Sequence, residues 1–232
     1  IVYAKNFKQI LKLVHRKIIL KFFLRFGNML VLFLILLLAV IAFFKTDVKD
    51  RFVKTKLDEI IKSDIDKDND GIDDYTDILK GAKDFISTKP KYKSKYYDGG
   101  YPTDEYRVCT DIIWYSLKNA GYDFKTLIDE DIKNNKEEYD EDVGDANIDF
   151  RRVRNIKVYL DRNTMNLEND SDFNPGDIVV YKDHIAIVSD KLNKDGQNYI
   201  LHQHMYQTYE YDGLFKNKIL GHYRWRLNDG KE

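Results

Sequence analysis

The feature that most constrains the fold is a pair of β-branched runs, separated by a short polar break, between residues 174 and 190. The first run, Ile178 to Val180, follows Pro175-Gly176-Asp177. Pro presets φ and Gly accepts a positive φ, so this tripeptide predicts a tight turn. The second run, Ile185 to Val188, begins directly after His184. Because β-branched residues favour strands, both runs are predicted to be buried strands, with His184 held at the start of the second.

The sole cysteine, Cys109, lies upstream of His184. A single Cys followed by a distant His is the arrangement expected of a thiol nucleophile and its base. Apolar residues recur at helical spacing after Cys109 and the run stops at Gly121, so we predict that Cys109 opens a helix. Amides at a helix N-terminus and a neighbouring imidazolium lower a thiol pKa, and the amides can also hold an oxyanion. The alternative is a small buried residue, as free Cys usually is.

These segments together resemble the core of NlpC/P60 cysteine peptidases, a papain-like superfamily. In that superfamily a Cys opens a helix, a His opens a strand of the following sheet, and a third polar residue lies on the next strand. More specifically, the chain resembles a bacterial domain-of-unknown-function family within the superfamily, over about residues 92–227. The matching segments are Tyr101-Pro102, Val108 to Asp111, Asn147 to Val153, Pro175 to Asp177, His184 to Asp190 and Gly221 to Arg224.

The resemblance implies an α+β, papain-like domain in which the helix bearing Cys109 packs on an antiparallel sheet. It also implies that Cys109 attacks, that His184 is base and then acid, and that catalysis needs no cofactor. The third member falls in the predicted strand 198–204, where alternation puts His202 and Gln203 on opposite faces. We expect His202 to orient His184, with Gln203 as the alternative.

Five further residues are predicted to support catalysis or bind substrate: Asp111, Asp149, Arg151, Arg152 and His222. Asp111 stands in the first turn of the helix, where its charge favours the helix dipole but opposes a thiolate, so it is structural or orients substrate. Asp149 is a helix cap in the simpler interpretation. Arg151 or Arg152 would clamp a substrate carboxylate, and peptidoglycan stem peptides carry such groups. His222 lines the cleft or is structural.

The N-terminal region predicts a membrane anchor. Residues 29–44 are sixteen consecutive apolar residues, and extending back to residue 26 gives nineteen, near the ~20 that span a bilayer. Basic residues precede the run, which places the N-terminus in the cytoplasm. We therefore expect a basic cytoplasmic arm (1–25), a transmembrane helix (26–44), a helical stalk (45–91) and a hydrolase domain (92–232). The chain is then a single-pass plasma-membrane protein with its C-terminal domain outside; a cleaved signal peptide is the alternative.

The stalk is expected to contain a calcium loop. Asp66, Asp68, Asp70 and Gly71 have the spacing of oxygen ligands on a turning loop, and position twelve is Asp77. Asp74 is a further possible ligand. Clustered carboxylates repel unless neutralised, so a structural Ca²⁺ is favoured over a solvated acidic turn.

The remaining segments complete an α+β pattern of helices followed by strands. Helices are expected at 46–63, 75–88, 125–134 and 153–163, and strands at 177–182, 184–190, 198–204, 206–211 and 219–227. Residues 1–45 carry six Lys, two Arg and no acid, a formal charge of +8. Because the whole chain has a formal net charge of −1, the remaining residues carry −9. That balance excludes nucleic acid as a partner of the folded part, because phosphate binding needs clustered base.

The sequence therefore predicts a membrane-anchored, outward-facing cysteine hydrolase that cleaves an amide bond in a cell-wall peptide. Two alternatives stay open. One is a catalytically silent module that binds cell wall or peptide, and the other is a different acyl transfer, such as transamidation or lipid hydrolysis.

Overall fold

The computed structural model describes residues 33, 35–38, 60–170, 172–206 and 208–226. The chain divides into two units, Ile1–Phe52 and Val53–Glu232. In the first unit the described residues, Phe33 and 35–38, are helical. All other described residues belong to the second unit, which contains every element discussed below.

The expected fold class is corrected at its N-terminus. Among the described residues, no helix combines the length and the apolar composition that crossing a membrane requires. This finding contradicts the expected transmembrane helix, and with it the single-pass plasma-membrane location and the outward-facing domain. The basic arm 1–25 lies outside the described residues.

The helices of the second unit agree closely with the periodicity of the sequence. Asp73 caps α2 by accepting a hydrogen bond from the Thr76 amide, and Asp123 caps α4 in the same way at Thr126. The α-helices are α2 (Asp74–Ser87), α3 (Asp111–Asn119), α4 (Phe124–Asn134) and α5 (Val153–Asn163), with short 3₁₀ helices η2 (Lys136–Glu138) and η3 (Asp149–Arg151). The helix expected at 46–63 lies outside the described residues up to 59, and residues 60–63 are not helical.

A six-stranded sheet with order β3-β8-β4-β5-β6-β7 forms the other layer, and all its neighbours are antiparallel. Its strands are β3 (Met165–Leu167), β4 (Ile178–Val180), β5 (Ile185–Leu192), β6 (Asn198–Gln203), β7 (Thr208–Tyr211) and β8 (Gly221–Arg224). A separate parallel pair joins β1 (Lys91–Tyr92) to β2 (Tyr106–Arg107). The α+β class with an antiparallel sheet is confirmed; β1, β2 and β3 were not predicted, because strands of two or three residues carry no alternation signal.

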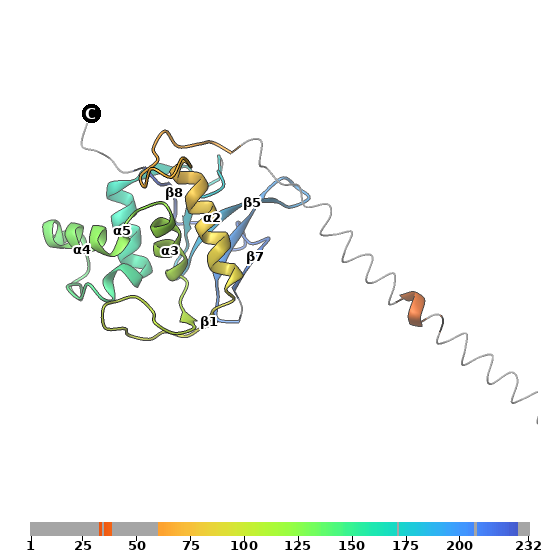
Figure 1. The fold of residues 1–232 in the computed structure, drawn as a ribbon, viewed down its shortest axis with the longest axis horizontal. Helices are drawn as coiled ribbons and strands as arrows, with labels where there is room; N and C mark the ends of the chain where they lie inside the picture. Colours follow the sequence, from red (N-terminus) through yellow and green to blue (C-terminus); the bar gives the residue numbers. More distant parts are fainter. Residues whose placement is uncertain (1–32, 34, 39–59, 171, 207, 227–232) are drawn as a thin grey trace, which may run out of the picture. The chain divides into compact units, whose positions relative to one another are not determined.

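Each face of the sheet covers a different apolar core. On one face α2 and α3 lie side by side against the strands (Figure 1), and Ile112, Leu117, Ile187 and Leu201 pack together there. On the other face Val179, Val188 and Ile200 pack with Phe173, Leu214 and Ile219 from connecting segments. Residues that alternate along β4, β5 and β6 therefore serve opposite cores, as strand geometry requires.

The segment expected to be a stalk is part of this unit. Ile78, Leu79, Ala82 and Phe85 of α2 are buried in the same core as α3 and the sheet. The expected boundary between residues 91 and 92 therefore falls inside one packed body. Burial of the apolar face of α2 is the physical reason, since an amphipathic helix is stabilised mainly by covering that face.

Candidate active site

The Pro175-Gly176 turn leads into β4 as predicted. Gly176 has a φ of +94°, which residues with a Cβ seldom adopt. A Cβ there would also lie 2.8 Å from the carbonyl oxygen of Tyr75 in α2. Glycine is thus required both by the backbone conformation and by the close approach of the helix.

Asp177 is the centre of a buried ionic cluster with His222 and Arg224. Its carboxylate accepts two hydrogen bonds from the Arg224 guanidinium, both at 2.8 Å, and one from His222 Nε2 at 2.9 Å. His222 Nδ1 donates to the Glu168 carbonyl at 2.7 Å. Both ring nitrogens of His222 therefore face acceptors. Of the two roles expected for His222, the geometry supports the structural one: it is 1% exposed and ties β8 to the turn before β4.

His184 closes the two-residue turn between β4 and β5 as predicted. The Tyr181 amide donates to the His184 carbonyl at 2.8 Å, and the two rings stack. The ring of His184 points to β6, where its Nε2 lies 2.8 Å from Nδ1 of His202. His202 is 3% exposed and its Nε2 is buried with no hydrogen-bond partner. The structure thus joins the two histidines that the sequence assigned to one site.

The alternative third residue, Gln203, faces the other way. Its amide nitrogen donates to the Pro90 carbonyl at 3.2 Å, and its Oε1 is buried without a partner. His202 and Gln203 alternate along β6, so only one of them can meet His184. The geometry selects His202.

Cys109 lies two residues before α3 and is 7% exposed. The backbone amides of Ile185, Thr110 and Cys109 itself lie close enough to the sulfur to favour its charged form. Ile185 follows His184 directly, so the sulfur sits at the start of β5. Pairing between β5 and β6 begins at Ile187 and Leu201, which leaves the Ile185 amide available to the sulfur. Within the described residues, no hydrogen bond joins the Cys109 sulfur to the His184 ring, whose Nε2 is bonded to His202.

Burial dominates the electrostatics of this site. Removal from water raises the pKa of Cys109 to about 11; the Asp111 charge adds to the rise, and the three amides oppose it. Burial also lowers the pKa of His184 to about 4, with His204 adding to the effect. Burial, then His184 and His204, lowers the pKa of His202 to about 3. The expected lowering of the thiol pKa is outweighed by desolvation, so at pH 7 the site holds a thiol and two neutral imidazoles.

Asp111 and Arg151 are bound to each other in the interior. Arg151 forms two hydrogen bonds with the Asp111 carboxylate, at 2.8 and 2.9 Å, and their side chains are 1% and 0% exposed. Asp111 also accepts from the amide of Val108, the residue before Cys109, at 2.7 Å. Arg151 therefore has no free face for a substrate carboxylate, and the predicted clamp is wrong for this residue. The pair instead fixes the turn that carries Cys109.

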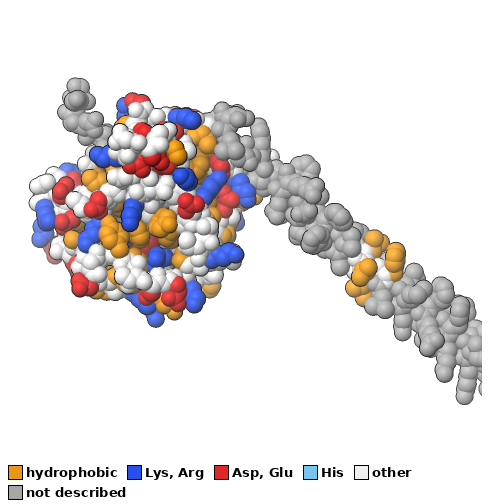
Figure 2. Space-filling model, in the orientation of Figure 1, with side chains coloured by type: hydrophobic (Ala, Val, Ile, Leu, Met, Phe, Trp, Pro, Cys, Tyr) orange, Lys and Arg blue, Asp and Glu red, His pale blue; other side chains and the backbone are white. Residues whose placement is uncertain are grey.

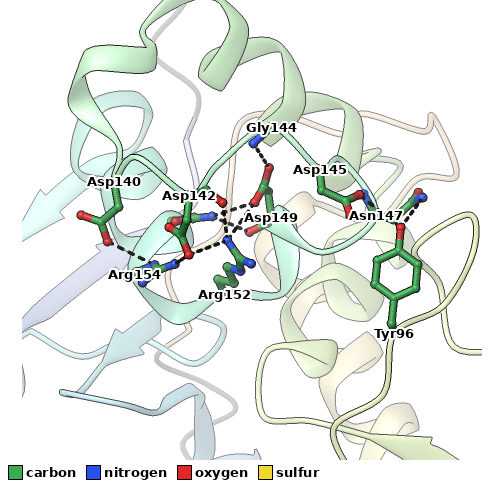
Figure 3. Close-up of polar contacts among 10 residues, drawn as sticks. Tyr96, Asp140, Asp142, Gly144, Asp145, Asn147, Asp149, Arg152 and Arg154 are labelled. Carbon is green, nitrogen blue, oxygen red and sulfur yellow. Dashed lines mark hydrogen bonds and ion pairs between the residues drawn. The ribbon is translucent and has the colours of Figure 1, made fainter.

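Asp149, which is buried in η3, and Arg152, which follows η3, belong to a polar network with exposed acids (Figure 3). Asp149 accepts from the Gly144 amide at 2.8 Å, so it holds the preceding loop rather than capping α5. Arg152 lies 3.2 Å from Asp142 and 3.4 Å from Asp149, and Arg154 pairs with Asp140 and Asp142 (Figure 3). The Arg152 guanidinium is already paired with acids of its own chain, which leaves substrate binding by this residue without support from the geometry.

A pocket of about 570 Å³ has His204 in its lining, and the His204 ring is 5.9 Å from the His184 ring. Tyr92 also lines it, and burial, then the charges of Cys109 and Asp111, raise the pKa of this tyrosine. Its lining consists of Lys89, Pro90, Lys91, Tyr92, Tyr106, His204, Met205 and Tyr206. The sequence interpretation missed Tyr92, for which no motif exists. The same-face spacing of His202 and His204 was the signal for His204.

The Asp-rich loop gathers three carboxylates. Oxygens of Asp66, Asp68 and Asp70 lie within 4.8 Å of one another. Asp74 is not part of this group; it is buried, and its carboxylate accepts from the Lys67 amide and the Tyr122 hydroxyl. Asp77 stands in the first turn of α2 and is 1% exposed. Asp74 therefore has a structural role instead of the predicted ligand role. Asp66, Asp68, Asp70 and Asp77 stay predicted calcium ligands.

Comparison with known proteins gives a family and one relative. Residues 79–225 match the model of the family described as Domain of unknown function (DUF1287). The chain is also 33% identical over 164 residues to the uncharacterized protein YijF of Escherichia coli (strain K12), which covers 64% of this chain and 80% of that protein. No solved structure matches the chain. The matched region contains Cys109, His184 and His202, and it begins inside α2.

Proposed function

This chain belongs to the DUF1287 family, and we propose that it is a cysteine hydrolase that cleaves an amide bond in a cell-wall peptide. One observation carries the proposal: the single cysteine of the chain lies beside the start of β5, next to His184, whose ring is hydrogen-bonded to His202. The resemblance to NlpC/P60 cysteine peptidases supplies the substrate class. Acyl transfer is the chemistry that a thiol, a base and an orienting group gathered in one region can support.

The hydrogen bond between the histidines decides which nitrogen acts as base. Nε2 of His184 is bonded to His202 Nδ1, which leaves His184 Nδ1 to take a proton from Cys109. Nδ1 can do so only when the ring proton is on Nε2, where it donates to His202 Nδ1. The lone pair of His202 then also stabilises the imidazolium that forms at His184, the task that a carboxylate has in many triads.

The reaction begins from the neutral pair rather than from a preformed thiolate. As Cys109 Sγ bonds to the carbonyl carbon, its proton moves to His184 Nδ1 and the carbonyl π electrons move to oxygen. Amides that face the sulfur, such as that of Thr110, then stabilise the charge on this oxygen. The C–N bond breaks and the amine leaves with the proton from His184. Water attacks the thioester with His184 as base, which releases the carboxylic acid and restores the thiol.

The pocket beside the site suits a peptide with a free carboxylate. Lys89 supplies positive charge to its lining, and Tyr92, Tyr106 and Tyr206 supply flat apolar surface. Arg151, Arg152 and Lys91 are bonded to acids within the protein, so Lys89 replaces the two arginines as the proposed partner of a substrate carboxylate.

The proposal is tested by incubating the full chain with purified cell-wall fragments and measuring the products by mass spectrometry. We expect a mass gain of one water per cleaved bond, lost in Cys109→Ala. Alkylation gives a second readout, because iodoacetamide has a single cysteine to modify. Alkylation at pH 7 should be slower in His184→Ala than in the parent chain. Intact fragments together with equal alkylation rates would overturn the hydrolase and leave a binding module.

A further inference from the structure

Beyond the hydrolase site, we propose that Asp66, Asp68, Asp70 and Asp77 form a calcium site that fastens the Asp-rich loop to the first turn of α2. The first observation is the grouping of the three loop carboxylates within 4.8 Å. In Figure 2 acidic side chains gather where Figure 1 draws the loop before α2. Because a cluster of exposed acids is common in itself, the proposal depends on what the fourth carboxylate does.

Asp77 is buried and incompletely bonded. It is 1% exposed, and its Oδ2 has no hydrogen-bond partner. Its Oδ1 receives only a long contact of 3.4 Å from the Asn119 amide group. A buried carboxylate oxygen without a donor is strongly unfavourable, which indicates that a cation belongs beside it. Neither Asp77 nor any of the loop carboxylates forms an ion pair with a Lys, Arg or His in the part of the chain that the structure describes.

Two contacts place Asp77 and the loop on the same short stretch of chain after α3. Asn119 donates to the Asp77 carbonyl at 2.9 Å. Two residues later, a Cβ at Gly121 would lie only 2.9 Å from Cβ of Asp68. The charges of Asp70, Asp68 and Asp66 all act on the Asp77 carboxylate. Together with the two contacts, this places the buried Asp77 near the loop that carries the other three carboxylates.

The backbone of the loop has the turn that such a site needs. Counted from Asp66, the ligands occupy positions 1, 3, 5 and 12, and Gly71 at position 6 has a φ of +91°. Amides of Asp70, Gly71 and Ile72 donate to the loop carboxylates and hold their oxygens inward. All the donors are hard oxygens, and their number and charge suit Ca²⁺ better than Mg²⁺, which keeps its waters and demands octahedral geometry.

Calorimetry on the full, metal-stripped chain tests the site without using hydrolase activity. Calcium should bind with a Kd below about 1 mM and raise the midpoint of thermal unfolding, and magnesium should bind more weakly. Asp68→Asn and Asp77→Asn, which keep the side-chain volume, should each weaken calcium binding at least about tenfold. Asp84→Asn makes the same charge change on an exposed position of α2 and should leave binding unchanged.

Two results would overturn the proposal. The first is the absence of both heat and a thermal shift at about 10 mM calcium. The second is undiminished affinity in Asp77→Asn, which would mean that the loop binds the ion without the helix. If Asp77→Asn does not fold, Asp70→Asn provides the same comparison from an exposed ligand, and equal binding by that variant would likewise reject the site.

Discussion

Two histidine sites lie on the same sheet, and they are bonded in opposite ways. Both nitrogens of His222 face acceptors, the Asp177 carboxylate and the Glu168 carbonyl, and Arg224 also pairs with Asp177. Within the described residues the rings of His184 and His202 hydrogen-bond to each other, and His202 Nε2 has no partner. The first ring is therefore fully bonded in the interior. Burial lowers the pKa of both rings of the second pair, so they are neutral at pH 7 and one nitrogen stays unbonded.

Burial alone therefore does not distinguish a structural histidine from a reactive one. His202 and His222 are 3% and 1% exposed, so accessibility ranks them together. What separates them is whether every ring nitrogen has a partner, because a satisfied ring has no capacity left for chemistry. Incomplete bonding at the His184–His202 pair is the kind of local strain that is expected at functional sites.

The largest expected effect tests the reactive side of the comparison. Cys109→Ser should lower turnover of a cell-wall peptide about 10⁴-fold or more, because a hydroxyl is far less acidic than a thiol. His184→Ala should lose a comparable amount, and the double variant should be little worse than either single one, since nucleophile and base act as a unit. Steady-state kinetics checks this, with circular dichroism to show that the fold is kept. Near-normal turnover in Cys109→Ser would end the thiol mechanism.

The next largest effect tests the structural side. Asp177→Asn leaves the Arg224 guanidinium without its buried counter-charge, so the free energy of unfolding should fall by about 3–5 kcal/mol. Denaturant unfolding measures this. Asp183→Asn, in the exposed turn beside His184, is the matched control and should change stability by less than about 0.5 kcal/mol. Equal free energies of unfolding for the two variants would show that the Asp177 cluster does not stabilise the fold.

A smaller effect on turnover is expected when the hydrogen bond between His184 and His202 is removed. His202→Ala removes an acceptor for the imidazolium at His184, worth about 1.5–3 kcal/mol, which corresponds to roughly 10- to 150-fold in kcat. His202→Asn keeps an acceptor oxygen near the position of Nδ1 and should recover much of that loss. The ratio of kcat for the two variants is the measurement. If both variants fall equally, His202 acts through packing and not through this hydrogen bond.

The smallest effect is a nearly flat pH profile. With a His184 pKa of about 4, about nine-tenths of the base form is present at pH 5, compared with about 3% for an ordinary histidine. The rate should therefore change little between pH 7 and pH 5 and fall as the pH drops through 4. A tenfold loss between pH 7 and pH 5, with the fold intact, would show that His184 titrates as an exposed imidazole.

The same shifts set the direction of stability with pH. The pKa values of His184 and His202 are lower in the folded chain than in the unfolded one, so the unfolded chain binds more protons below pH 6.5. Their contribution to stability is therefore complete above pH 6.5 and is lost as the pH falls toward 4 and 3. Thermal unfolding at pH 7 and pH 5 should show the lower midpoint at pH 5.

The local structural features of this protein could be predicted from its sequence. The apolar spacing gave α5 its bounds, Val153–Asn163, and the Pro-Gly pair gave the turn before β4. Alternation along β6 narrowed the third member of the site to His202 or Gln203. These features depend on residues within a few positions of one another, whose φ, ψ and side-chain directions the local chain already limits.

Only the tertiary structure decided what each polar side chain does. Arg151 met Asp111 from 40 positions away, and His222 met Asp177 from 45 positions away, which removed both from the predicted substrate site. The thiol pKa was raised rather than lowered. Burial of Cys109 in the core destabilises its thiolate more than the three neighbouring amides stabilise it. Hydrogen-bond partners and desolvation arise from contacts between distant segments, and sequence periodicity carries no record of them.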